Sequence, residues 1–157
     1  MTRQQLTRII VPVKQKPRSL TTEKEAVLNI LKAADRIDRY LRELMKPWSL
    51  TTHQFNVLRI LRGAGPEGLP TLDVGERMIE KTPGITRLLD RLEEKGLVRR
   101  ERCRADRRQV LCYLTDKASA LLAEMDEPIV VGDRACMARL TRDEQRQLSE
   151  LLSRTGP

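Results

Sequence analysis

Threonines followed by apolar residues at helical spacing divide most of this chain into segments. A threonine before a helix accepts hydrogen bonds from the first free backbone amides, and a Glu or Gln three residues later completes a capping box. Three of the threonines have such a partner, in the pairs Thr22–Glu25, Thr51–Gln54 and Thr141–Glu144. The pattern predicts six helices, which begin at Thr22, Thr51, Thr71, Thr82, Thr115 and Thr141.

The ends of these helices follow from proline, glycine and the last apolar residue in register. We expect the first helix to end near Pro47, the second at Gly63 and the fourth at Gly96. Pro83 suits the first helical position of the fourth helix, and Pro128 should kink or interrupt the fifth. Each of the later helices has apolar residues at helical spacing. In the third helix they are Leu72, Val74 and Met78, and in the fourth they are Ile85, Leu88, Leu89 and Leu92. In the fifth they are Ala118, Leu121, Leu122 and Met125, and in the last they are Leu148, Leu151 and Leu152.

The apolar period changes from helical to alternating after Gly96. Residues 97–103 and 109–114 read as two short strands, and Val110, Cys112 and Leu114 alternate inward on the second. A tight charged turn, residues 104–108, joins them. The predicted order is α-α-α-α-β-β-α-α, and the two short helices before the ribbon indicate a helix-turn-helix with a wing. The expected fold class is therefore mainly α with a small β-wing.

A net charge of +8 favours a polyanionic partner, nucleic acid before an acidic membrane surface. Basic residues are in excess in two places. Residues 1–20 contain five Lys or Arg and no acid, and we interpret them as a basic arm that lies either along DNA or against dimerisation helices. The second excess runs from Lys95 to Arg108.

Other functional classes find little support in the residues present. We expect no secretory signal and no membrane span, and three cysteines without CxxC spacing do not suggest disulfides or zinc. His53 is the only histidine, so neither a metal site nor a catalytic base is indicated. We expect a cytoplasmic protein that is not an enzyme and needs no cofactor.

The fourth predicted helix is the candidate for entering a major groove of duplex DNA. With its apolar residues turned inward, Thr86, Arg87, Asp90 and Arg91 should face outward. Arginine is the commonest reader of guanine, so Arg87 is the candidate base contact and Arg91 a base or phosphate contact. At the tip, Thr82, Pro83 and Gly84 let the backbone approach a phosphate.

The predicted ribbon supplies the second candidate DNA contact. Arg99, Arg100, Arg102, Arg104, Arg107 and Arg108 lie within ten residues. A hairpin tip with arginines can enter the narrow minor groove, where the negative potential is concentrated. Asp106 repels phosphate, so we expect it to orient an arginine rather than to contact DNA.

At this point the sequence resembles the multiple-antibiotic-resistance regulator (MarR) family. The resemblance is carried by residues 82–100, TPGITRLLDRLEEKGLVRR, by Asp106-Arg107-Arg108 and by Leu114-Thr115. It implies a winged helix-turn-helix at about residues 50–115 and dimerisation helices at about 22–47 and 116–154, within a single domain of residues 21–157. It also implies that the region around Arg87 contacts the major groove and that Arg107 or Arg108 is the minor-groove arginine.

The resemblance further implies a homodimer that releases DNA when a small lipophilic or phenolic ligand binds, and we expect it to act as a repressor. Two identical lobes related by a two-fold axis should bind an inverted-repeat operator. The wide apolar stripes of the first and last helices predict a dimer independently, because one thin lobe cannot cover them. Two alternatives remain open. One is a redox-responsive regulator, for which Cys103 between Arg102 and Arg104 is the candidate thiol. The other is a protein-binding module that has lost DNA binding.

Overall fold

The computed structural model describes residues 20–79, 84–103 and 106–156. Within them the helices are α1 (Thr22–Met45), α2 (Thr52–Ala64), α3 (Thr71–Arg77), α4 (Ile85–Glu94), α5 (Asp116–Met137) and α6 (Arg142–Ser153). The described strands are β1 (Leu69–Pro70), β2 (Val98–Arg102) and β3 (Val110–Leu114), and short 3-10 turns cover Lys46–Trp48 and Gly65–Glu67. The chain divides into two units, Met1–Ala34 and Asp35–Pro157, with the boundary inside α1. The predicted fold class is confirmed, whereas the predicted basic arm lies outside the described residues except for Leu20.

Three of the predicted threonine caps are confirmed. The Thr51 hydroxyl accepts from the Gln54 amide at 3.1 Å, and the Gln54 side chain accepts from the Thr51 amide at 3.1 Å. Thr141 and Glu144 form the same reciprocal box, at 3.3 and 2.7 Å. The Thr115 hydroxyl accepts from the third amide of α5 at 3.2 Å. These helices start where the local sequence predicts, because both partners are three residues apart on one short segment.

The predicted cap at Thr22 is wrong, whereas the predicted helix start at Thr71 is confirmed. Helix α1 begins at Thr22, but the Lys24 amide donates to the hydroxyl of Thr21 at 3.3 Å, so the cap is one residue earlier. Thr71 is the first residue of α3, as predicted. Its hydroxyl donates to the carbonyl oxygen of Val110 at 3.2 Å. The side chain of Thr71 therefore joins α3 to β3 across the fold.

Two further predictions about helices need correction. A kink or an interruption was predicted at Pro128, and the interruption is wrong because α5 continues to Met137. The buried residues Met125 and Ile129 on either side of Pro128 keep the helix packed on the core, which offsets the one hydrogen bond that proline removes. Val74 of α3 and Met78, which directly follows the helix, are buried as predicted, but Leu72 of α3 is 76% exposed.

The described strands form an antiparallel sheet in the order β1-β3-β2. In the β2–β3 pair Val98 is opposite Leu114 and Arg100 is opposite Cys112, while Leu69 of β1 pairs with Cys112 from the other side. The sequence predicted β2 and β3 but not β1. A two-residue strand that ends in proline shows no alternation, and only its pairing with β3 identifies it.

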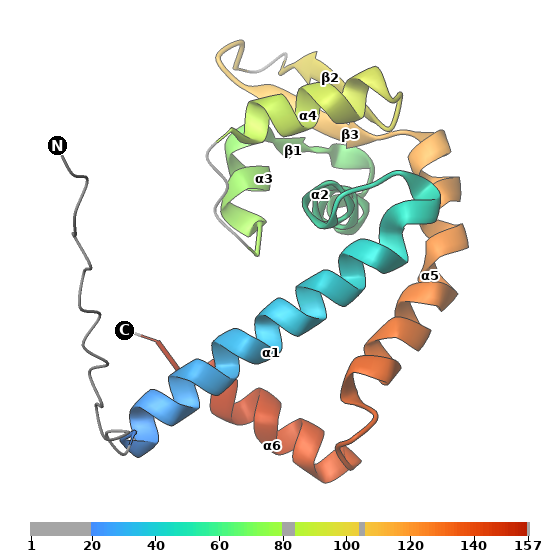
Figure 1. The fold of residues 1–157 in the computed structure, drawn as a ribbon. Helices are drawn as coiled ribbons and strands as arrows, with labels where there is room; N and C mark the ends of the chain where they lie inside the picture. The colour runs from blue at the N-terminus through green and yellow to red at the C-terminus, as the bar shows by residue number, and fades with distance from the viewer. Residues whose placement is uncertain (1–19, 80–83, 104–105, 157) are drawn as a thin grey trace, which may run out of the picture. The chain divides into compact units, whose positions relative to one another are not determined.

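An aliphatic core joins these elements within the second unit. Figure 1 shows α2 surrounded by α3, α4 and the strands, and α5 leading away from the end of β3. The side chains with no measurable exposure come from α2, α3, α4, α5 and β3, namely Val57, Leu58, Val74, Leu89, Leu92, Cys112, Ala118, Leu122 and Met125. Because α4 contributes one face to this core, its opposite face is left open.

Gly75 of α3 lies beside Ile85, the first residue of α4. A methyl group added at Gly75 would lie 3.7 Å from Ile85, which is an ordinary contact. The approach of the two helices therefore does not itself require glycine. None of the helices in the described part of the chain has the length and apolar character needed to cross a bilayer.

Candidate nucleic-acid interface

Helix α4 has two faces of opposite character. Leu89 and Leu92 are buried in the core, whereas Thr86, Arg87 and Arg91 are exposed, as the sequence predicted. Among the described residues, neither arginine forms an ion pair, so both guanidinium groups point into solvent with their donors available. An exposed helix face with unpaired arginines can bind phosphates and base edges.

The start of α4 differs from the prediction. The helix begins at Ile85, and Gly84 precedes it as the N-cap with φ 108°. The Gly84 carbonyl accepts the first helical hydrogen bond, from the Leu88 amide at 3.2 Å. No side chain caps this end in the described residues. Thr82 and Pro83, which were expected to form the cap and the first turn, lie outside the described residues.

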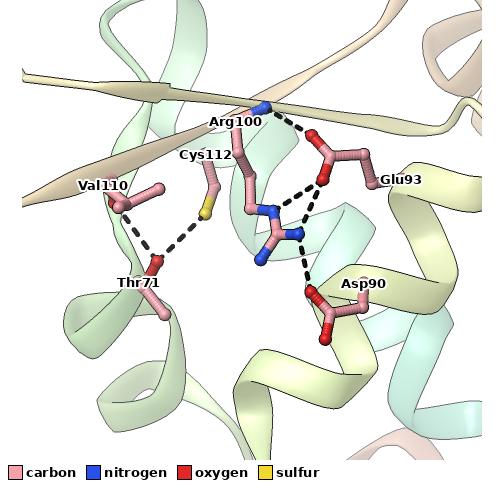
Figure 2. A network of polar contacts seen from close by, with 6 residues as sticks. All are labelled: Thr71, Asp90, Glu93, Arg100, Val110 and Cys112. Atoms are coloured by element: carbon pink, nitrogen blue, oxygen red, sulfur yellow. Dashed lines mark hydrogen bonds and ion pairs between the residues drawn. The ribbon is translucent and has the colours of Figure 1, made fainter.

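Arg100, one of the basic residues assigned to the wing, is held by two carboxylates of α4. Its Nε donates to Glu93 Oε2 at 2.9 Å, and its Nη2 donates to Glu93 Oε2 and to Asp90 Oδ1, each at 2.6 Å. The Arg100 amide also donates to Glu93 Oε1 at 3.1 Å. Figure 2 shows the guanidinium reaching from β2 toward both acids. The hydrogen bond with Glu93 is the main cause that raises the pKa of Arg100 above its ordinary value.

This network corrects two predictions. Asp90 was expected to face outward with Arg87, but its carboxylate is turned to Arg100. Arg100 was counted among the free basic residues, but its side chain is only 22% exposed. The sequence contained a signal for this position, because strand alternation from the buried Val98 places Arg100 on the same face of β2.

The remaining arginines of the ribbon fall into two groups. Arg99 is engaged, because its guanidinium carbon lies 4.4 Å from the ring centroid of Tyr113 and it also pairs with Glu101. Arg102, Arg107 and Arg108 are exposed. Arg104 lies outside the described residues. The basic run in the sequence therefore provides fewer open guanidinium groups than its composition suggests.

The wing turn is organised by Asp106. Its carboxylate accepts from the Arg108 amide at 3.0 Å and from the Gln109 side-chain amide at 3.3 Å. Its carbonyl accepts from the Gln109 amide at 3.0 Å. Asp106 was predicted to orient an arginine, and these contacts act on the backbone of Arg108 rather than on a guanidinium group. The Arg107 and Arg108 side chains are left exposed at the turn.

A hollow of about 460 Å³ lies between α4 and the wing turn. Leu72 of α3, Thr86 of α4, Arg100 of β2, and Arg108 and Gln109 of the wing turn are among the residues that line it. The lining offers donors on Thr86, Arg108 and Gln109, and it also includes the carboxylate of Asp73.

The three cysteines differ in environment. Cys112 is fully buried, and burial raises the pKa of its thiol. Its sulfur lies 3.5 Å from the hydroxyl of Thr71 (Figure 2). Because that hydroxyl donates its one hydrogen to Val110, the thiol is the donor in this contact. Burial likewise raises the pKa of Cys136, and the candidate redox thiol Cys103 is half-buried.

The described residues contain no group of three or more His, Cys, Asp or Glu side chains placed to hold a metal ion.

Comparison with known proteins places this geometry in a family. The model of the MarR family matches residues 50–110. The HTH-type transcriptional regulator TtmR of Methylorubrum extorquens is 43% identical over 88 residues, which are 55% of this chain and 44% of that protein. The match therefore spans less than half the length of that curated relative.

Solved structures match over more of the chain. A mutant MarR from E. coli complexed with operator DNA is 28% identical with a TM-score of 0.77, over 85% of this chain and 94% of that one. A MarR transcription factor from Planctomyces limnophilus is 36% identical with a TM-score of 0.67, over 89% of this chain and 100% of that one. Because the 36% identity with the Planctomyces limnophilus protein extends over all of that solved chain, this chain belongs to the MarR family of winged-helix, DNA-binding transcriptional regulators.

Proposed function

We propose that this regulator is a homodimeric repressor that binds an inverted-repeat operator in duplex DNA, with α4 in the major groove. The observation that carries the proposal is the open face of α4, where Thr86, Arg87 and Arg91 are exposed opposite a buried leucine stripe. A helix of this kind fits the width of the B-DNA major groove, where each base pair presents a distinct set of donors and acceptors.

Each residue on this face has a proposed role. Arg87, in the first turn of α4, donates to the O6 and N7 atoms of a guanine, while Thr86 and Arg91 contact the flanking base or phosphate. Gly84 has no side chain to separate the backbone from a phosphate, and Thr82 and Pro83 are proposed to share this contact. Neighbouring residues of one helix then do two different things: some contact phosphates and so fix the position of the protein on DNA, and others contact bases and so recognise the sequence.

The wing is proposed to bind the adjacent minor groove. Arg107 and Arg108 project from a turn that Asp106 holds in place, and Arg104 is proposed to join them. One sugar–phosphate strand separates a major groove from the neighbouring minor groove. With α4 in one and the wing in the other, this strand passes over the hollow lined by Thr86 and Arg108. Narrow A·T-rich sequence would favour the wing arginines.

Apolar side chains left exposed on the helices outside the lobe support the dimer. Val130 and Val131 of α5 are 41% and 51% exposed, and Leu151 and Leu152 of α6 are 47% and 40% exposed. In the first unit, Val27, Ile30 and Leu31 of α1 are exposed as well. A second copy that covers these residues would bury an area typical of obligate dimers, above roughly 2,000 Å². A two-fold axis then requires half-sites about 10 base pairs apart.

Release of DNA is proposed to follow the binding of a small lipophilic or phenolic ligand. A thiol switch at Cys112 is disfavoured, because its side chain is fully buried and burial raises its pKa, while the thiolate is the reactive form.

The deciding experiment is an electrophoretic mobility shift with the DNA upstream of the chain's own gene, followed by footprinting. The expected result is a protected inverted repeat at nanomolar protein and moderate salt. Protection of a direct repeat, or equal affinity for unrelated DNA, would contradict the proposal.

A further inference from the structure

We propose that Arg100 is a positioning residue for DNA recognition: it neutralises Asp90 and Glu93 and fixes α4 on β2, so that the arginines of α4 can approach phosphates. This inference rests on the proposed function of α4. It assigns Arg100 a role different from that of the exposed arginines around it, because Arg100 acts through two carboxylates and not through DNA.

The contacts of Arg100 are directed into the protein. Three of its five N–H donors are used, two on Glu93 and one on Asp90, at 2.6 to 2.9 Å. Its backbone amide binds the second oxygen of Glu93 at 3.1 Å. By contrast, Arg102 lies two residues further along the same strand and is exposed. The two arginines can therefore be compared directly, because Arg100 is bound to carboxylates and Arg102 is exposed to solvent.

The charge on α4 explains why neutralisation matters. Asp90 lies three residues after Arg87 and directly before Arg91, and its side chain is 44% exposed. Glu93 is 39% exposed. A DNA strand that reaches Arg87 and Arg91 therefore comes near both acids, and unpaired carboxylates there would repel its phosphates. Arg100 pairs with both acids and removes most of this repulsion.

The same contacts restrain the helix. The covalent connection between α4 and β2 is short, running through Gly96 with φ 68°. The Asp90–Arg100 contact lies more than one helical turn before this connection, so α4 cannot pivot about Gly96 without breaking it. Strand β2 leads directly into the wing, so Arg100 also maintains the spacing between α4 and the wing turn.

A double-mutant cycle tests the proposal. The dissociation constant for one operator duplex at one salt concentration is measured for the wild type, R100Q, D90N/E93Q and the triple variant. We expect R100Q to weaken binding about 10-fold, because it exposes two uncompensated acids. In the D90N/E93Q background the same substitution should change affinity less than about 3-fold, because no acid is left to neutralise.

Arg102→Gln is the control for a direct basic contact, and its effect should be the same in both backgrounds. If R100Q also has equal effects in both backgrounds, Arg100 acts on DNA itself and the proposal is wrong. It is equally wrong if R100Q lowers the melting temperature but leaves the affinity of the folded protein unchanged. Should R100Q fail to fold, R100K replaces it in the cycle. We then expect R100K to lower the affinity for DNA partly in the wild-type background and not at all in D90N/E93Q. Lysine keeps the positive charge but lacks the several N–H donors of the planar guanidinium.

A last variant separates this inference from the proposed function. Arg87→Ala removes the proposed base contact without touching the Arg100 network. If Arg87→Ala weakens binding and the Arg100 cycle shows no coupling, the inference alone fails. If Arg87→Ala leaves binding unchanged, the proposed role of α4 fails.

Discussion

Replacing Gly68 with alanine should destabilise the winged-helix lobe more than any other glycine substitution in the described residues. Gly68 has φ 69° and ψ −173°, a region that side-chain-bearing residues enter at a cost of about 1–3 kcal/mol. An added Cβ would lie 2.5 Å from Cε1 of Tyr113 and 2.9 Å from the carbonyl oxygen of Cys112. Both distances are well below a normal contact of about 3.5 Å or more.

The neighbours of Gly68 cannot easily move away. The Cys112 carbonyl belongs to the central strand β3, which pairs with β1 and β2. The Tyr113 ring packs against the guanidinium of Arg99. Overpacking of this kind costs about 1–3 kcal/mol, so backbone strain and overlap together predict a loss of about 2–6 kcal/mol.

Urea denaturation at a single protomer concentration measures this loss as a change in the free energy of unfolding. Gly63→Ala is the matched control, because Gly63 lies within α2 and an added Cβ meets nothing within 4 Å. We expect that variant to be more stable by about 0.5–1 kcal/mol. A loss below about 1 kcal/mol for Gly68→Ala would refute the reasoning.

Four further predictions concern DNA binding, assembly and the buried thiol of Cys112. Arg87→Ala should weaken the binding free energy for the preferred operator by about 1–3 kcal/mol and remove the preference for one base pair. An equal loss of affinity for random DNA would show that Arg87 contacts only a phosphate. Replacing Arg107 and Arg108 by alanine should lower the slope of log K against log salt by about 0.9 for each phosphate that is no longer neutralised, and an unchanged slope would disprove the wing contact. Light scattering at micromolar protein should give twice the 18.1 kDa of one chain, and L151E/L152E should shift this toward the monomer if α6 forms the interface. Cys112 should react with a thiol reagent at pH 8 only after unfolding. Because its folded pKa is raised, its contribution to stability is present below the ordinary thiol pKa of about 8.5 and is lost as pH rises above it.

Helix starts could be predicted wherever the stabilising partners are close in the chain. The boxes at Thr51 and Thr141 depend on residues three positions apart, so the local sequence contains the whole interaction. The leucine stripe of α4 is likewise a local pattern, and it predicted that Arg87 and Arg91 would be exposed. In the sequence, Thr71 is equivalent to the other threonines. In the structure, however, its hydroxyl donates to the carbonyl oxygen of Val110, which is 39 residues away in the chain.

The properties that depend on distant pairing were decided by the tertiary structure. Strand β1 is defined by its hydrogen-bonded pairing with β3. Without that pairing, Leu69 would be part of a loop. From the sequence alone, Arg99, Arg100 and Arg102 are equivalent residues of one basic run. In the fold, Arg99 stacks on Tyr113, Arg100 binds two acids of α4, and Arg102 alone of these three is exposed and unpaired among the described residues. The sequence by itself determined that the surface is basic and which helix face is open. Which guanidinium groups are available to DNA depends on contacts between segments that only the packed chain brings within hydrogen-bonding distance.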